Sequence, residues 1–116
     1  MEYTLLIYVD PSTYATMSEA DMGKMMADYG TFTEGLGARF KAGAPLQPVA
    51  TASSVRVRDG KRLTTDGPFA ETKEHLVGFY HVDAADLDEA LDLAAGIPDS
   101  VRGTIEVRPV MDLPGM

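Results

Sequence analysis

The sequence concentrates its chemically versatile side chains between Asp66 and His75. This stretch reads DGPFAETKEH and combines three carboxylates with a lysine and a histidine. A carboxylate held in a partly dry cavity can act as a general base, and a lysine can hold an anionic substrate. We therefore nominate Asp66, Glu71 and Lys73 as candidate catalytic residues.

The same stretch is also typical of a purely structural bend. Asp66 can accept hydrogen bonds from the backbone of an Asx-type turn, and Pro68 presets the backbone angle that such a turn needs. Phe69 would then anchor the loop, and the charged residues after it would form a solvated run whose ion pairs contribute little. Residue types and spacing leave both interpretations open.

Other reactive groups are few. The chain lacks cysteine, which excludes disulfide bonds, thiolate nucleophiles and cysteine-based zinc sites. Glu71, Glu74 and His75 lack the paired-histidine spacing of zinc enzymes, so we expect no metal site. His81 alternates in step with Phe79 and is expected to be a structural histidine on the helix-covered side of a strand. Neither a nucleophilic serine motif nor a phosphate-binding glycine loop is present, so no cofactor is expected.

Composition and charge bound the class of protein. The chain has 116 residues, 45% of them hydrophobic, as expected of one globular domain spanning 1–116. A net charge of −8 argues against nucleic-acid binding, which relies on neutralising phosphates. No basic leader is apparent, and no apolar run approaches the roughly 18 residues of a membrane span. We expect a cytoplasmic protein that does not contact a membrane.

Two helices are predicted from capping signals and apolar periodicity. The first begins after Ser18, a good N-cap with Asp21 in the capping-box position, and its apolar stripe runs toward a stop near Gly43. The second is bounded by the N-cap Asp86 and by Gly96. Both helices are expected to gain their stability from packing of the apolar stripe.

Asp59 and Gly60 predict a tight β-hairpin. They separate two alternating segments, and this dipeptide suits a two-residue turn with positive φ. The turn fixes the register, so that Arg58 faces Lys61 and both share one face with Arg56. Like charges that face each other repel, so either water solvates this basic face or an acidic surface of a second subunit covers it.

The remaining apolar runs read as strands. They are Glu2–Val9, Leu76–Asp83 and 103–110, in addition to the two arms of the hairpin. Strand, helix, hairpin, strand, helix, strand is the β-α-β-β-α-β ferredoxin-like pattern with an enlarged middle. We therefore expect an α+β fold in which two helices cover one face of an antiparallel sheet.

The other face of that sheet is expected to be mixed in character. Ile7, Phe79 and Val107 are predicted to point at the helices. The opposite face would then carry Thr4, Leu6, Tyr8, Tyr80, Val82, Glu106 and Arg108. A face of this kind is commonly buried by a second copy of itself, so we expect a two-fold homodimer that encloses a partly polar cavity. The residues nominated to bind substrate in that cavity are Tyr8, Tyr80, Glu106 and Arg108.

Four segments carry a resemblance that covers nearly the whole chain. YTLLIYVD, DGPFAETKE, DLDEAL and IEVRPVMD resemble the DGPFAETKE family of YCII-related proteins. The resemblance implies a dimeric α+β barrel built on ferredoxin-like protomers. It also implies relatives that include a dehydrochlorinase-like enzyme, and members encoded beside extracytoplasmic-function sigma factors. In the broader group a His–Asp pair with an early histidine has been proposed as catalytic. Here the only histidines, His75 and His81, lie in the second half, so that pair is not carried over.

Two classes of function follow. The first is a homodimer that binds a small anionic molecule, or transforms it by cofactor-free acid–base chemistry of the lyase or hydrolase kind. The alternative is a regulatory module whose basic hairpin and acidic helices bind a partner such as a sigma factor. Fold analogy does not choose between these classes.

Overall fold

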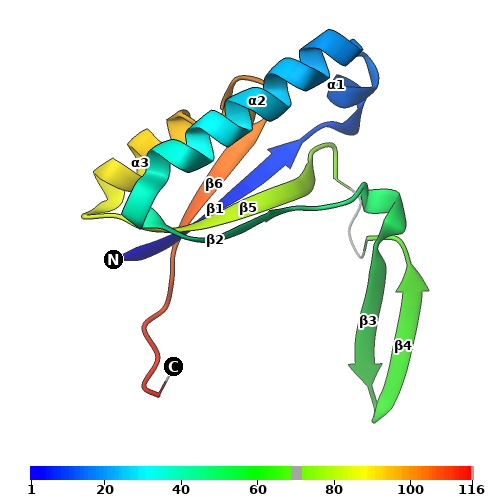
Figure 1. Ribbon diagram of the computed structural model, residues 1–116. Helices are drawn as coiled ribbons and strands as arrows, with labels where there is room; N and C mark the ends of the chain where they lie inside the picture. The colour runs from blue at the N-terminus through cyan, green and yellow to red at the C-terminus, as the bar shows by residue number, and fades with distance from the viewer. Residues whose placement is uncertain (69–71, 116) are drawn as a thin grey trace.

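The structure is a computed structural model that describes residues 1–68 and 72–115 of the chain (Figure 1). In chain order its elements are β1 (Glu2–Val9), α1 (Pro11–Ala15), α2 (Glu19–Leu36), β2 (Phe40–Pro45), β3 (Ser53–Arg58), β4 (Lys61–Asp66), β5 (His75–Asp83), α3 (Leu87–Ala95) and β6 (Thr104–Pro109). Three short 3-10 turns, η1 (Gly37–Arg39), η2 (Val49–Thr51) and η3 (Pro98–Val101), connect some of them.

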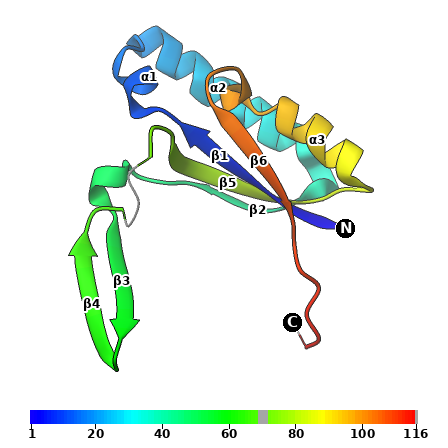
Figure 2. The same ribbon diagram turned by 180° about the vertical axis from the view of Figure 1, so that it is seen from behind.

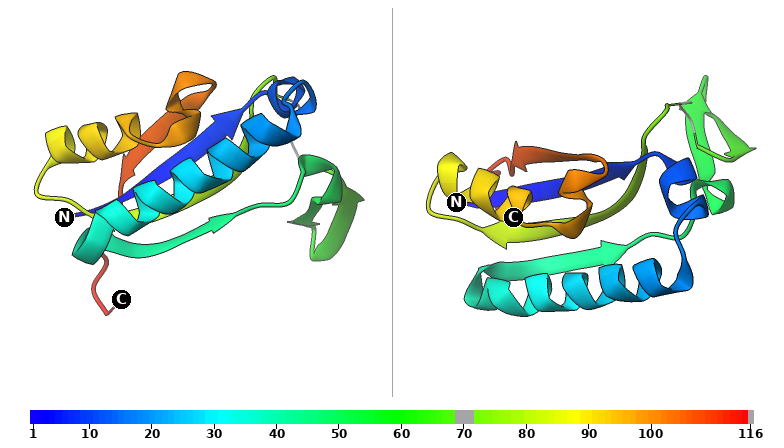
Figure 3. Two further views of the ribbon diagram at one scale, coloured as in Figure 1. Left: turned by 45° about the horizontal axis from the view of Figure 1, so that its top comes forward. Right: turned by 90° about the horizontal axis from the view of Figure 1, so that it is seen from above.

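Four strands form one antiparallel sheet in the order β2-β5-β1-β6. The helices lie on one face of this sheet, and the other face is open (Figure 1). Seen from above, α2 runs along the β2 edge while α3 lies nearer β6 (Figure 3). Taken without the hairpin and α1, the order β1-α2-β2-β5-α3-β6 is the ferredoxin-like pattern. The predicted antiparallel α+β fold is therefore confirmed.

Both predicted helix caps are present. The hydroxyl of Ser18 accepts a hydrogen bond from the backbone N–H of Asp21 at 3.0 Å. The carboxylate of Asp86 accepts from the N–H of Glu89 at 2.9 Å, and Glu89 in turn accepts from the N–H of Ala85 at 3.0 Å. These reciprocal bonds satisfy amide groups that the first helical turn leaves without partners, which fixes where α2 and α3 begin.

The predicted end of the first helix is wrong. α2 ends at Leu36, because Gly37 adopts a φ of 57° that leaves the helical region. Phe40 then begins β2, an edge strand that the proline-rich sequence did not indicate. An edge position tolerates Pro45, since only one side of such a strand needs to pair.

The hairpin has the predicted turn and register but not the predicted place. Asp59 and Gly60 have φ values of 52° and 73°, and Arg58 pairs with Lys61. Within the described residues, β3 and β4 pair only with each other, as a separate two-stranded sheet inserted between β2 and β5. They project away from the helices (Figure 2). The edge place in the main sheet is taken by β2.

The predicted orientation of β5 is also wrong. Ile7 and Val107 do pack on the helix side, but Phe79 pairs with Leu6 on the open face. Tyr80 pairs with Leu5 and is 8% exposed on the helix side. Alternation separates the two faces of a strand without telling which one is buried.

The same inversion affects Val82 and His81. Val82 is fully buried on the helix side, whereas His81 pairs with Thr4 on the open face. The Nε2 atom of His81 lies 3.2 Å from Oε1 of Glu2, one pair further along the same face. The structure therefore does not support His81 as a core histidine of the helix-covered side.

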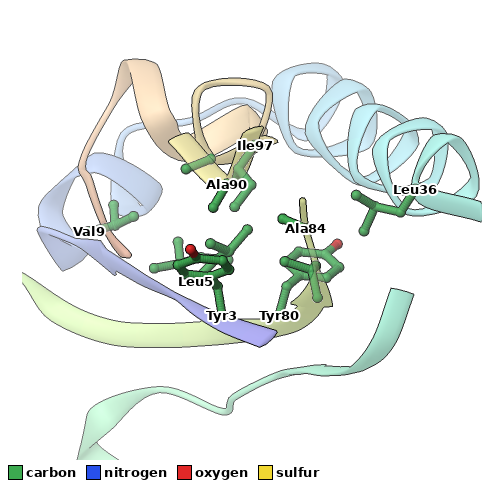
Figure 4. Close-up of a cluster of buried hydrophobic side chains, with 11 residues drawn as sticks. Tyr3, Leu5, Val9, Leu36, Tyr80, Ala84, Ala90 and Ile97 are labelled. Carbon is green, nitrogen blue, oxygen red and sulfur yellow. The ribbon is translucent and has the colours of Figure 1, made fainter. Parts of the chain in front are cut away.

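One core lies between the sheet and the helices. Its buried members come from β1, β5, α2, α3 and the adjoining turns, and include Tyr3, Leu5, Ile7, Val9, Leu36, Tyr80, Val82, Ala84, Ala90, Ala94 and Ile97 (Figure 4). The small residues Ala90 and Ala94, both buried, let α3 approach the sheet closely.

We expect the chain to tolerate a methyl group at Gly23 but not at Gly103. A Cβ on Gly103 would collide with the backbone oxygen of Tyr8 in β1, whereas a Cβ on Gly23 in α2 would meet open space. Gly103→Ala should lower the free energy of unfolding by about 2 kcal/mol. Gly23→Ala should raise it by about 1 kcal/mol because alanine favours the helix. Urea unfolding of both variants measures this, and equal effects would contradict the close approach of β6 to β1.

Candidate functional site

A cavity of about 680 Å³ lies between α2 and the β2–β5 edge of the sheet. This volume falls in the range of ligand pockets in proteins. Apolar side chains of α2, β2, β5 and the segment from the end of β2 into η2 form most of the wall, among them Met25, Met26, Phe40, Leu46, Val49 and Val77. The cavity is therefore a mostly apolar space with room for a small organic molecule.

Small residues make this space. Gly43 and Ala44 of β2 and Gly78 of β5 form part of the lining under α2. A Cβ on Gly43 would come within 3.1 Å of a ring carbon of Tyr80, and a Cβ on Gly78 within 3.0 Å of the Ala44 oxygen. Larger side chains at these positions would disturb the sheet and fill the cavity. The absence of large side chains at these positions therefore leaves space between the sheet edge and α2.

A buried carboxylate lies in the wall of the cavity. Asp99, in η3, is 1% exposed. Its Oδ2 accepts hydrogen bonds from the hydroxyls of Tyr14 at 2.8 Å and Tyr29 at 2.6 Å. Its Oδ1 accepts from Nε of Arg102 at 2.9 Å. The charge of Asp99 is therefore balanced by one guanidinium and solvated by two phenols.

Both phenols hold their protons tightly. Burial, and then the hydrogen bond to Asp99, raise the pKa of Tyr14 well above its ordinary value. The same causes raise the pKa of Tyr29. Since each hydroxyl gives its proton to Asp99, its oxygen retains lone pairs that can accept a hydrogen bond from another group.

A second polar pair lies further along the cavity. The hydroxyls of Thr33 and Tyr80 are 2.7 Å apart and share a hydrogen bond. The ring of Tyr80 meets that of Phe32 edge to face, with 5.2 Å between centroids. Tyr80 is consequently fixed in orientation, and its ring forms part of the cavity wall.

His75 stands where the cavity meets the end of β1. It is the first residue of β5, pairs with Val9, and lines the cavity. Its Nδ1 is buried and finds no hydrogen-bond partner among residues 1–68 and 72–115. A buried imidazole nitrogen without a partner is costly, so it marks a position where a ligand would be stabilising.

Asp10 shows how the charges near His75 are arranged. The backbone N–H of Ser12, and then its hydroxyl, lower the pKa of the Asp10 carboxyl, which caps α1. Lys73 and His75, which lie nearby, lower this pKa further. The end of the loop before β5 therefore approaches the start of α1.

The structure divides the residues nominated to bind substrate. Tyr8, Glu106 and Arg108 lie on the open face, where Arg108 pairs with Thr4 across the strands. Tyr80 lies on the helix side and lines the cavity under α2. The four residues therefore do not line one cavity within this chain, and the cause is the inverted orientation of β5.

The nominated catalytic residues lie outside the cavity wall where they are described. Asp66 is the exposed last residue of β4, and Lys73 is exposed in the loop. The bend after Asp66 is held by Gly67, whose N–H donates to the Ala52 oxygen at 2.7 Å. Glu71, like Phe69, lies outside the described residues. Catalysis by Asp66, Glu71 and Lys73 stays a prediction.

Sequence reasoning missed the polar residues that do line the cavity. Tyr29 was visible only as one member of the apolar stripe of α2, and Tyr14 and Asp99 stood in short connecting segments. His75 is the last residue of the charged stretch 66–75, and its spacing did not indicate a position in a cavity wall. Only burial distinguishes these residues, and burial depends on contacts between segments up to 85 positions apart.

Two negative findings concern the described residues. Within 1–68 and 72–115, no group of three or more His, Cys, Asp or Glu side chains is placed to hold a metal ion. In that same part of the chain, no helix is both long and apolar enough to cross a membrane.

A ferredoxin-like sheet with a cavity under its long helix defines the class of this domain. The family is more specific: the family model described as YCII-related domain matches residues 1–114, and the chain belongs to this family. A relative, an uncharacterized protein of Rhizobium meliloti (strain 1021), is 39% identical over 114 residues, which cover 95% of this chain and 92% of the relative.

A solved structure supports the fold. The 5-chloro-2-hydroxyhydroquinone dehydrochlorinase TftG of Burkholderia phenoliruptrix, in complex with 2,5-dihydroxybenzoquinone, superimposes with a TM-score of 0.57. The match covers 96% of this chain and 94% of that one, at 14% sequence identity. This likeness concerns the fold. The alternative of a sigma-factor partner stays a prediction.

The phenol–carboxylate cluster predicts a specific loss of stability at alkaline pH. The folded state keeps the protons of Tyr14 and Tyr29 where the unfolded chain, with tyrosine pKa values of about 10, releases them. This contribution is complete below about pH 10 and is lost as the pH rises toward the raised folded values.

Replacing both residues, Tyr14→Phe/Tyr29→Phe, should make the free energy of unfolding fall less steeply with pH. The slope should change by the amount that corresponds to the release of up to about one proton for each phenol removed. Urea unfolding at several pH values above about 9 gives the slope, and data near neutral pH are the control, because no difference in slope is expected there. Equal alkaline slopes in the variant and the wild type would contradict the raised pKa values.

Proposed function

We propose that this protein binds a small, neutral organic molecule, ring-shaped and carrying a hydroxyl group, in the cavity under α2. The observation that carries the proposal is the Asp99 cluster in the wall of an apolar cavity of about 680 Å³. A few fixed polar groups in an apolar wall are what orients a small ligand.

The hydrogen-bonding groups of the cavity wall indicate which kind of ligand fits. Tyr14 and Tyr29 donate to Asp99, so their oxygens offer acceptors to the cavity. A ligand hydroxyl can donate to these oxygens, while an anion would face lone pairs and the carboxylate of Asp99. A neutral phenol or alcohol therefore suits this wall better than the small anion expected from the loop residues.

His75 is the group suited to move a proton on such a ligand. An imidazole can accept or donate a proton, and the buried Nδ1 of His75 lacks a partner among the described residues. The fold neighbour TftG is a dehydrochlorinase whose structure holds 2,5-dihydroxybenzoquinone, a ring with oxygen substituents. This supports acid–base chemistry without a cofactor as the activity of the site.

We further propose that the protein is a homodimer joined through the open face. That face presents Leu6, Tyr8 and Phe79 from β1 and β5, with Glu106 and Arg108 beside them on β6. An open sheet face of aromatic and aliphatic side chains is suited to pack on a copy of itself, and two-fold symmetry places each polar residue near its counterpart.

Filling the cavity should abolish ligand binding. Gly30 of α2 lines the cavity, and a Cβ there meets open space. Gly30→Phe should therefore occupy the cavity and weaken binding of hydroquinone, a neutral phenol, by about a hundredfold or more in isothermal titration. Gly23→Phe, in the same helix but outside the cavity, is the matched control and should bind as the wild type does. Equal binding by both variants would exclude this cavity.

The same ligand tests His75. With hydroquinone bound, exchange of its ring hydrogens with solvent deuterium, followed by NMR, should be faster than in free solution. His75→Gln should retain affinity and lose that acceleration, because an amide does not accept and release protons near neutral pH. An unchanged exchange rate in His75→Gln would remove His75 from the chemistry but leave the binding site intact.

The dimer has its own test. Leu6→Asp/Phe79→Asp would place two charges on the open face, and light scattering should then report a monomer because burying unpaired charges is costly. Lys24→Asp/Lys41→Asp, on exposed positions of α2 and β2, is the control and should stay dimeric. A wild-type protein that is monomeric at micromolar concentration would overturn the dimer.

A further inference from the structure

The hairpin of residues 53–66, here called the arm, lacks the cover that its side chains need. Within the described residues its strands pair only with each other, and it projects on the side opposite the helices (Figures 1 and 2). Val55 and Val57, on one face, are 61% and 62% exposed, and Leu63, on the other, is 50% exposed. An isolated two-stranded hairpin is marginally stable in water, so this arm gains stability if a partner packs on it.

Charge identifies the kind of partner. The arm holds four of the ten basic residues of the chain and only two of its eighteen acidic ones. The rest of the chain is accordingly strongly acidic. Oppositely charged surfaces attract and orient each other, and a second copy of this chain supplies such an acidic surface at equal concentration.

One acidic surface matches the arm in detail. The segment 83–95, which contains α3, includes five acidic residues and no lysine or arginine. On α3, Leu87 and Leu91 are 49% and 47% exposed, and Asp88 and Asp92 are exposed beside them. Each pair is spaced by four residues, so its members are neighbours on the helix surface. An apolar pair therefore lies next to an acidic pair.

The arm offers the complementary pattern. Leu63 pairs with Arg56, and the next pair along the same face joins Arg58 to Lys61. An apolar side chain on this face is thus surrounded by basic ones. Placed against α3, Leu63 would cover the two leucines while the arginines approach the aspartates.

The positions of the arm and α3 allow this contact between two copies. They lie toward opposite ends of the sheet and on opposite sides of it (Figure 1). Consider a two-fold axis that lies parallel to the open face and runs perpendicular to the strands. Rotation about this axis places the arm of one copy at the α3 end of the other copy's sheet. Strands of six residues extend roughly 20 Å, while packed sheets lie about 10 Å apart, so the arm passes the partner's sheet and reaches its helices.

We propose that the arm of each copy clasps α3 of a second copy. Leu63 packs on Leu87 and Leu91, and Arg56 and Arg58 pair with Asp88 and Asp92. Two-fold symmetry forms this contact twice in each dimer. The inference rests on the homodimer proposed above and adds the surface that secures it.

Charge reversal and charge exchange test the clasp. Arg56→Glu/Arg58→Glu should raise the dissociation constant of the dimer about tenfold in sedimentation equilibrium, because two exposed ion pairs are replaced by repulsion. Lys24→Glu/Lys41→Glu makes the same change in net charge elsewhere and should leave the dissociation constant near that of the wild type. Combining the arm reversal with Asp88→Arg/Asp92→Arg should restore the wild-type value.

The outcomes separate the clasp from the dimer. The clasp is overturned if Arg56→Glu/Arg58→Glu leaves the dissociation constant unchanged. It is also overturned if the combined variant dimerises no more tightly than the arm variant alone. Either result leaves the open-face dimer standing. A monomeric wild type overturns both. Tenfold weakening that the α3 exchange reverses supports the clasp, and binding of hydroquinone measured on the same samples reports the cavity independently.

Discussion

The carboxylate of Asp99 is the group on which the architecture around the cavity depends. A buried carboxylate needs hydrogen-bond donors, and Tyr14, Tyr29 and Arg102 supply them from α1, α2 and the end of η3. The two tyrosine bonds hold α1 and α2 against the segment that precedes β6, while Arg102 balances the charge of Asp99 within that segment. α2 is also buried at Met25 and at its last residue, Leu36, so it is held over the β2–β5 edge of the sheet.

This placement of α2 creates the cavity, and small residues keep it open. Gly43 and Gly78 leave no side chain on the floor, while Tyr80 is held in the wall by Thr33. The polar groups are few, fixed and buried, and the rest of the wall is apolar. This combination favours a ligand with a hydroxyl group on an apolar ring, and His75 adds a titratable group in the same wall. The stability of the fold and the chemistry of the site therefore use the same residues.

The opposite side of the sheet follows from the ferredoxin-like topology. Helices cover only one face, so Leu6 and Phe79 lie on the open one. The arm projects past this face and carries basic charge on an otherwise acidic chain. A second copy would cover the open face and the arm together. The role proposed for the arm therefore depends on the oligomeric state. The cavity lies on the other side, so a ligand does not compete with the partner.

The sequence by itself determined the local features: the strand β1, the N-caps Ser18 and Asp86, and the register of the arm around Asp59. Each depends on interactions between residues a few positions apart, which periodicity and turn chemistry reveal. Only the tertiary structure decided which face of β5 is buried, that β2 rather than the arm completes the sheet, and that Asp99 meets Tyr14 and Tyr29. These outcomes depend on the summed packing of distant segments, which no local pattern encodes.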